Sequence, residues 1–307
     1  GGSPLSITVE PSAAHAPSCV AEGDGLRVAV AGDLATFSIR AHDEFGRPKL
    51  MGGEAFEAFA APREQPHAPV QAAGLEAHAA RGDGLVAIID QGNGTYIGRY
   101  TLRHAGRYLL HVRRDGVAIQ GSPFALRVAP GSADAAACVV RGDGARVATA
   151  GRPGSFVIDA FDTFGNARVP SLEGPSRHFE ASLIPLNVEL RAHATPCEVE
   201  RLGPGASTFV GRYVATAAGE YAIAVRLHGE ALPQQPTLIV LPAETAAACC
   251  VASGAGLVSA VAGEVAAFAI RARDAYGNAR DCEDDAFEVT LRPAEAGAAG
   301  AAGAAGV

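Results

Sequence analysis

The stretch NGTYIGRYTLRHAGRYLLHVRRDGVAIQGSPFALRV, from Asn93 to Val128, decides the fold. Asn93-Gly94 is a turn signal of the kind that joins two strands. Tyr96 and Tyr100 then lie two pleats apart, so both side chains face the same side of one strand. Tyr108 opens the next strand, a position from which a tyrosine hydroxyl often bonds upstream backbone in a sandwich. The pattern therefore favours a structural role for these tyrosines over a catalytic one.

The pattern of this stretch recurs along the chain. Thr95 to Val112 matches Thr208 to Val225 at an offset of 208 − 95 = 113 residues. A second block begins at Cys19 (CVAEGDGL), Cys138 (CVVRGDGA) and Cys250 (CVASGAGL), with offsets of 138 − 19 = 119 and 250 − 138 = 112 residues. A period of about 115 residues is the size of one sandwich domain.

A third block keeps the same two offsets and shows the period of a strand. It reads FSIRAHDEFGRP from Phe37, FVIDAFDTFGNAR from Phe156 and FAIRARDAYGNAR from Phe268. In the first two copies apolar residues alternate with polar or partly polar ones, which is typical of half-buried strands. Only Ala72 to Arg81, short and Ala-rich, has any helical character. The predicted fold class is all-β, with tandem immunoglobulin-like β-sandwiches.

Composition narrows the class of protein. The 307 residues are 48% hydrophobic but only 6% aromatic, and the net charge is −8. This acidic balance argues against nucleic acid as a partner. No apolar run reaches the roughly 18 residues that a membrane helix needs. The cysteines show neither zinc spacing nor a dense disulfide framework, so we expect buried free thiols; they are Cys19, Cys138, Cys197, Cys249, Cys250 and Cys282.

No catalytic constellation is visible, and we expect no enzyme, no cofactor and no metal site. The chain lacks a G-x-S-x-G elbow, a P-loop, an H-E-x-x-H helix and an EF-hand loop. The histidines at 67, 78, 104 and 111 are interpreted as solvated or packing residues. The acidic cluster Glu283, Asp284 and Asp285 is interpreted as a solvated turn, with cation binding as the alternative.

Three tripeptides have both a functional and a structural interpretation. Arg-Gly-Asp occurs at residues 81–83 and 141–143, and the second copy falls in a slot that reads Glu-Gly-Asp or Ser-Gly-Ala in the other repeats. A variable turn position is therefore favoured over receptor recognition. Asn93-Gly94-Thr95 is a glycosylation acceptor in a secreted chain, but a hairpin turn favours the same residues.

Taken as a set, these motifs resemble the filamin-type immunoglobulin-like repeat. They are Asp-x-(Phe/Tyr)-Gly-Asn, Gly-Thr-Tyr-x-x-x-Tyr, Gly-x-Tyr and Gly-Ser-Pro-Phe. The first repeat carries all four with Arg47 in place of the Asn, and the second ends in QQPTLIV instead of GSPFALRV. The residues concerned are Asp43, Phe45, Gly46, Gly94–Tyr96, Tyr100, Gly106, Tyr108 and Gly121–Phe124; Asp162, Phe164–Asn166, Tyr213, Gly219, Tyr221 and Pro236; and Asp274, Tyr276–Asn278.

The offsets set the expected domain boundaries. Residues 1–10 are interpreted as the last strand of a preceding repeat, 11–130 and 131–242 as complete repeats, and 243–293 as a partial repeat. Residues 294–307 are an Ala/Gly-rich tail with the composition of a disordered linker. We expect a segment cut from a longer array. The half-sandwich should be poorly packed or completed by another segment.

The resemblance implies a binding mode. Filamin-type repeats accept a partner strand in the groove between their third and fourth strands, which gains main-chain hydrogen bonds and side-chain pockets. Carried over, the strands are about 55–61 and 86–90 in the first repeat, and about 178–183 and 197–201 in the second. The groove residues expected are Phe56, Ala58, Val86 and Ile88, and Phe179, Ala181, Cys197 and Val199.

The predicted function is a non-enzymatic scaffold or linker that binds protein partners by strand addition. The resemblance implies a cytoplasmic location with an indirect link to the actin cytoskeleton. The alternative is an extracellular adhesion ectodomain built from the same repeats, and a third is a spacer beside an enzyme domain elsewhere in the gene. Between the groove strands, residues 62–84 form an unusually long connection, interpreted either as a cover over the groove or as a tolerated insertion.

Overall fold

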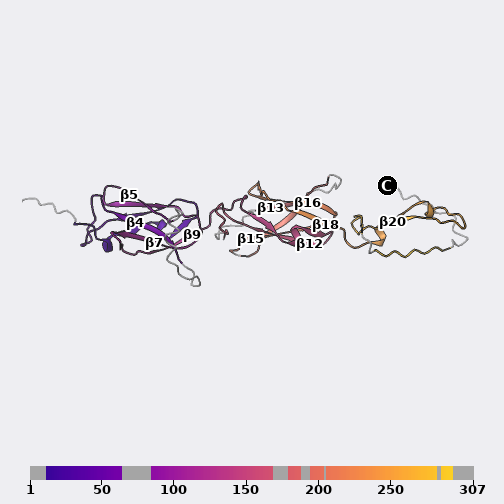
Figure 1. The fold of residues 1–307 in the computed structure, drawn as a ribbon, viewed down its shortest axis with the longest axis horizontal. Helices are drawn as coiled ribbons and strands as arrows, with labels where there is room; N and C mark the ends of the chain where they lie inside the picture. Colours follow the sequence, from indigo (N-terminus) through magenta and orange to yellow (C-terminus); the bar gives the residue numbers. More distant parts are fainter. Residues whose placement is uncertain are drawn as a thin grey trace, which may run out of the picture.

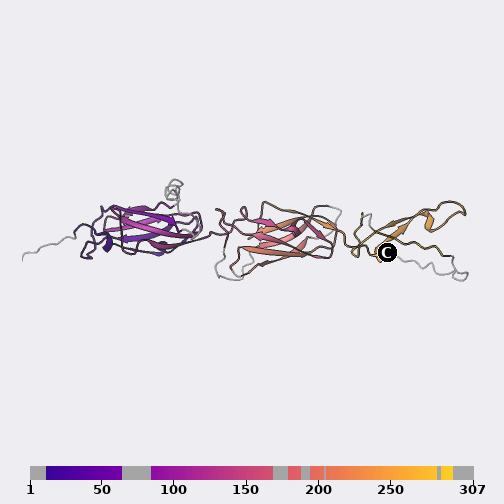
Figure 2. The same cartoon turned by 60° about the horizontal axis from the view of Figure 1, so that its bottom comes forward.

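The protein is an array of three β-units placed end to end (Figure 1). The computed structural model describes residues 12–63, 84–168, 179–187, 194–203, 205–281 and 285–292. Figure 2 shows the same linear order after rotation, with two sandwiches followed by a smaller unit around β20 (Ala269–Arg271). The predicted all-β tandem architecture is confirmed.

The first repeat is a sandwich of two sheets. One has the strand order β1-β3-β6-β5 and the other β2-β9-β7-β4, with β8 paired to β7. Most pairs are antiparallel, and β2 runs parallel to β9. The strands are β1 (Val20–Glu22), β2 (Val28–Val30), β3 (Ala35–Arg40), β4 (Phe56–Pro62), β5 (Ala87–Asp90), β6 (Thr95–Tyr100), β7 (Gly106–Arg114), β8 (Val117–Ala118) and β9 (Phe124–Ala129); two 3-10 turns are η1 (Ala16–Ser18) and η2 (Asp24–Leu26).

Alternation along the strands builds the core of this repeat. Phe37 and Ile39 of β3 are buried, as are Tyr96 and Tyr100 of β6, while Arg99 between the tyrosines is exposed. The Tyr100 hydroxyl donates to the Gly25 carbonyl inside the sandwich. The predicted placement of both tyrosines on one buried face is confirmed.

The predicted bond from the tyrosine near the start of a strand to upstream backbone, known as a tyrosine corner, is present in both complete repeats. The Tyr108 hydroxyl donates to the His104 carbonyl at 2.9 Å, and the Tyr221 hydroxyl donates to the Ala217 carbonyl at 2.9 Å. Each bond closes the loop that precedes its own strand, which pins the start of β7 in the first repeat and of its counterpart in the second. The tyrosines thus stabilise the loop between the two strands.

The second repeat keeps the same strand succession but joins its two sheets. Its strand order is β10-β12-β15-β14-β13-β16-β18-β11, with β17 paired to β16. The link between the sheets is the antiparallel pairing of β13 with β14. The elements are β10 (Val139–Arg141), η3 (Asp143–Ala145), β11 (Val147–Thr149), β12 (Pro153–Asp159), β13 (Phe179–Pro185), β14 (Thr195–Arg201), β15 (Thr208–Val214), β16 (Gly219–Leu227), β17 (Glu230–Ala231) and β18 (Thr237–Leu241).

The third unit has few paired strands. Its elements are η4 (Ala247–Cys249), β19 (Val251–Ser253), η5 (Ala255–Leu257) and β20, and β19 pairs with β20. Val265 is 98% exposed and Leu291 is 97% exposed. Large apolar side chains are therefore uncovered here, as expected for part of a sandwich.

The prediction of buried free thiols holds only in part. Cys19 and Cys138 are free and buried. Cys197, Cys249 and Cys250 are free but only half-buried, so the prediction of burial is wrong for these three. Cys197 lies in the middle of β14, where it pairs with Ala181 of β13, and the other two lie in the incompletely packed third unit.

Several expectations concern residues outside the described ranges. These are the orphan strand at 1–10, the helical stretch at 72–81, the first Arg-Gly-Asp, the tail, His67, His78, Cys282, Glu283 and Asp284. The domain boundaries likewise stay a prediction.

Candidate partner-strand site

Strand β4 of the first repeat forms an open sheet edge. It pairs with β7 on one side along its whole length. On its other side the described residues place one isolated bridge, Phe59 to Leu85, and the Ala60 amide donates to the Gly84 carbonyl at 2.9 Å. Strand β5, which corresponds to the fourth strand of the expected groove, belongs to the opposite sheet and is the last strand of that sheet. The two edges therefore face the same side of the sandwich.

The direction of the β4 amides defines where a partner can bond. Backbone groups of a strand alternate between its two neighbours, so the outward amide of Ala60 places those of Ala58 and Phe56 on the open side. Two residues before Phe56, the Glu54 amide donates to the Tyr96 hydroxyl at 2.8 Å. The open edge is therefore the segment from Phe56 to Ala58, bounded by a satisfied amide at each end.

The predicted groove residues of the first repeat lie beneath this edge. Phe56 and Ala58 are buried in the core, and Val86 and Ile88 are partly buried and pack against it. The Phe56 ring contacts the Tyr96 ring with centroids 4.8 Å apart. These side chains thus form the floor between the two strands, and the backbone of β4 supplies the hydrogen-bonding groups.

An aromatic and cationic cluster lies on the outer face of the same edge. Phe59 of β4 stacks on His111 of β7, with centroids 4.7 Å apart and planes at 11°. The Arg113 guanidinium lies 5.3 Å from the centre of the Phe59 ring. Burial, and secondarily the charge of Arg113, lower the pKa of His111. Sequence reasoning missed this cluster, although the pairing of two strands at a period of two would have placed Phe59 beside His111.

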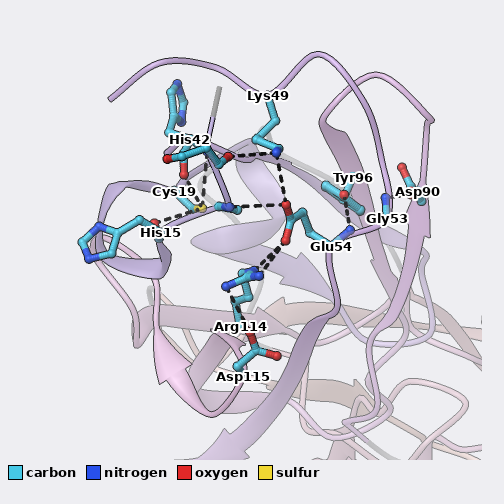
Figure 3. A network of polar contacts seen from close by, with 12 residues as sticks. His15, Cys19, His42, Lys49, Gly53, Glu54, Asp90, Tyr96, Arg114 and Asp115 are labelled. Carbon is cyan, nitrogen blue, oxygen red and sulfur yellow. Dashed lines mark hydrogen bonds and ion pairs between the residues drawn. The ribbon is translucent and has the colours of Figure 1, made fainter. Parts of the chain in front are cut away.

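A polar network fixes the start of β4 relative to its neighbours (Figure 3). Glu54, just before β4, accepts from Arg114 at the end of β7, with Nη2 2.7 Å and Nε 2.8 Å from Oε2. Lys49 Nζ lies 3.7 Å from Glu54 Oε1. Asp90, the last residue of β5, accepts from the Gly53 amide at 2.7 Å. Both open edges are therefore held at this end before any partner arrives.

The second repeat differs at the corresponding place. Ala181 of β13 pairs with Cys197 of β14, and Leu183 pairs with Thr195. Phe179 is buried, while Ala181, Cys197 and Val199 pack half-buried against the core. Burial raises the pKa of the Cys197 thiol to about 11, so it is no nucleophile at neutral pH. A strand added to β13 would have to displace β14, whereas within the described ranges no strand pairs with the outer side of β4 over Phe56–Ala58.

The remaining sequence motifs have structural partners. Arg141 of the second Arg-Gly-Asp forms an ion pair with Asp159, and Asp143 begins η3. The Asn93 side-chain oxygen Oδ1 accepts from the Thr95 amide at 3.0 Å, which closes the predicted turn. Asp285 accepts from Thr245 and Arg280.

Within the residues that the structure describes, no group of three or more His, Cys, Asp or Glu side chains is placed to hold a metal ion. In the same residues, no helix has the length and apolarity needed to span a bilayer.

The fold and the edge strands define a tandem array of immunoglobulin-like sandwiches. The family model for the filamin/ABP280 repeat matches residues 13–125 and 132–238. The chain therefore belongs to the filamin/ABP280 repeat family, as its motifs predicted.

The chain is similar to parts of two longer proteins. The chain is 32% identical to the E3 ubiquitin-protein ligase TRIM71 of Bos taurus over 120 residues, which cover 39% of this chain and 12% of that protein. It is 28% identical to Filamin-C of Rattus norvegicus over 204 residues, which cover 65% of this chain and 7% of that protein. The chain thus spans a small part of these relatives.

Two solved structures are among those to which the chain is similar. The Lin-41 filamin domain matches with 19% identity and a TM-score of 0.29, covering 39% of this chain and 100% of that one. The Escherichia coli adhesin FdeC matches with 16% identity and a TM-score of 0.49, covering 76% of this chain and 67% of that one.

Proposed function

We propose that this chain is a non-enzymatic scaffold that binds protein partners by strand addition to β4 of its first repeat. The observation that supports the proposal is the open edge at Phe56–Ala58, which has an apolar floor and is fixed at one end by Glu54 and Arg114. An added strand gains main-chain hydrogen bonds and places alternate side chains over Val86 and Ile88. One short strand of modest area corresponds to roughly micromolar affinity.

Substituting proline on the open edge tests the proposal. Ala58→Pro removes an outward amide but no hydrogen bond to β7, and edge strands tolerate proline at such positions. Peptides are first selected from a display library for binding to the unmodified full chain. They should bind the Ala58→Pro variant about tenfold more weakly, because one main-chain hydrogen bond is lost and the proline ring keeps the peptide backbone from approaching β4 closely. Titration calorimetry gives the affinities, and hydrogen exchange confirms that the first repeat stays folded.

The comparison variant is Ile88→Pro, on the neighbouring edge strand, which removes an outward amide of β5 together with one side chain of the floor. The Gln91 amide donates to the Thr95 carbonyl, so alternation points the Ile88 amide away from β6. Peptides that add to β4 should tolerate this change better than Ala58→Pro. Peptides that bind Ala58→Pro normally and fail on Ile88→Pro would show that β5 is the acceptor and would overturn the assignment to β4.

We propose that the long connection after β4 regulates the edge. Its described ends lie beside the site, since the Gly84 carbonyl bonds Ala60 and the Arg63 amide donates to the Arg107 carbonyl at 2.8 Å. Replacing residues 64–83 with a short Gly-Ser linker should raise the affinity of the same peptides. An unchanged affinity would identify the connection as a tolerated insertion.

We also propose a cytoplasmic location and an indirect link to actin, supported by the family and by similarity to Filamin-C. The cell-surface alternative is testable at Asn93, which is exposed on its turn. Peptide mapping of the natural protein, with and without glycosidase, decides between them. A glycan on Asn93 places the repeats outside the cell, and a bare Asn93 supports the cytoplasmic scaffold.

A further inference from the structure

The side chain of Asn166, in the loop after β12, forms hydrogen bonds with the first repeat. The Asn166 side-chain carbonyl accepts from the Ala105 amide at 2.8 Å, and its Nδ2 donates to the Arg103 carbonyl at 2.8 Å. Arg103 and Ala105 lie in the loop between β6 and β7 of the first repeat. One side chain thus satisfies both a donor and an acceptor of the preceding repeat, which fixes its position along that loop.

The joint between the second repeat and the third unit has the same construction. The Asn278 side chain accepts from the Ala218 amide at 2.9 Å and donates to the Thr216 carbonyl at 2.8 Å. Thr216 and Ala218 lie between β15 and β16, the counterparts of β6 and β7. Two joints in one chain therefore share one pattern of contacts.

An aromatic ring completes each joint. The Phe164 ring lies over Gly32 and the Tyr276 ring lies over Gly151, each ring in the space that a Cβ on the glycine would fill. Both glycines have a left-handed backbone, with φ of +87° and +75°. The receiving turn therefore needs glycine for its conformation and for the approach of the ring.

A buried carboxylate orients each asparagine. Asp162 Oδ2 accepts from Asn166 Nδ2 at 2.8 Å and from the Gly131 amide, in the linker between the repeats, at 2.8 Å. Asp274 Oδ2 does the same for Asn278 Nδ2 at 2.7 Å and the Ala243 amide at 2.9 Å. The loop, the linker and the preceding repeat are thus held through a single carboxylate.

From these contacts we infer that the Asp-x-aromatic-Gly-Asn loop is a latch that holds each repeat in one orientation on the repeat before it. Its partner is the glycine-bearing end of a filamin-type repeat, where one loop presents a carbonyl and an amide two residues apart. This assigns the motif an interface role, beyond its role as a turn inside the domain. The array is then a stiff rod at these two joints rather than a string of independent domains.

The first repeat supplies a natural contrast. Its loop has Arg47 where the latch has asparagine, and a guanidinium cannot accept a hydrogen bond. The Arg47 guanidinium lies 5.3 Å from the centre of the Phe45 ring instead. Changes at Arg47 should therefore leave the two described joints unaffected.

Residual dipolar couplings of the full chain test the latch. In a weakly aligning medium, amides of the first and second repeats in the unmodified chain should fit one shared alignment tensor. Asn166→Ala should abolish the shared tensor, so that each repeat requires its own. Phe164→Ala should act in the same direction without removing the asparagine hydrogen bonds.

Two matched variants control the experiment. Asn278→Ala should release only the third unit, and Arg47→Ala should change neither joint. Amide chemical shifts of the two cores show that each variant remains folded. Separate tensors in the unmodified chain, or a shared tensor that survives both Asn166→Ala and Phe164→Ala, would overturn the inference.

Discussion

Replacing Gly211 with alanine destabilises the second repeat by about 2–3 kcal/mol, because it overpacks a core that cannot relax. Gly211 lies in the middle of β15, directly opposite Phe156 of β12. A Cβ on Gly211 would meet the Phe156 ring, with the Cε1 atom at 2.8 Å and two further ring atoms closer. Phe156 is buried, and its ring also packs beside Tyr213 with centroids 6.2 Å apart. The ring therefore has no space into which to move.

Hydrogen exchange measured peptide by peptide is the suitable readout, since tandem repeats unfold separately and one global midpoint would mix them. Protection should fall in residues 131–242 and stay unchanged in the first repeat. Gly203→Ala is the matched control, because a Cβ there meets nothing within 4 Å and its cost should stay within about 0.5 kcal/mol. Equal effects of the two substitutions would refute the packing argument.

The same glycine shows what sequence could and could not predict. Tyr96, Tyr100 and their counterparts follow a period of two, so their buried face was predictable from the pattern alone. Gly98 and Gly211 look like turn residues in the sequence, yet each lies inside a strand beneath the ring of Phe37 or Phe156. That contact joins two strands far apart in sequence and becomes visible only when their register is known.

The sequence predicted which segments form the two strands of the candidate site, but not whether the edge of either strand is open to a partner. The third and fourth strands of the first repeat lie close to the expected ranges. Whether an edge is open depends on backbone pairing, which side-chain types do not reveal. Ala58 and Ala181 occupy equivalent positions, but Ala181 is paired with Cys197 and Ala58 has no strand beyond it among the described residues.

The joints were not predictable for a related reason. Asn166 and Asn278 belong to a motif whose aspartate, aromatic residue and glycine already explain a turn within one domain. Their side chains bond backbone groups of the preceding repeat, which carry no residue-type signal. Only the exchange of asparagine for Arg47 in the first repeat hints that this position has a separate role.

Replacing Asp162 with alanine should destabilise the second repeat by about 3 kcal/mol, because several buried donors lose a charged acceptor together. Asp162 is 1% exposed. Its carboxylate accepts from the amides of Phe164 and Asn166 at 2.9 Å, and from the Gly131 amide and Asn166 Nδ2 at 2.8 Å. Asp143→Ala, at an exposed aspartate of the same repeat, should change the free energy of unfolding by less than about 0.5 kcal/mol.

The pH dependence separates this electrostatic contribution from simple loss of packing. Burial alone would raise the pKa of Asp162, but the hydrogen bonds from Asn166, Gly131 and Phe164 outweigh it and lower the pKa. A lowered folded-state pKa gives stability that is present above the unfolded value of about 3.9 and lost as the pH falls through the folded value. The difference in unfolding free energy between the unmodified chain and Asp162→Ala should therefore shrink below about pH 4. Urea titrations at pH 7 and pH 3, followed through amide signals of the second repeat alone, measure it. A difference that is the same at both pH values would assign the loss to packing instead.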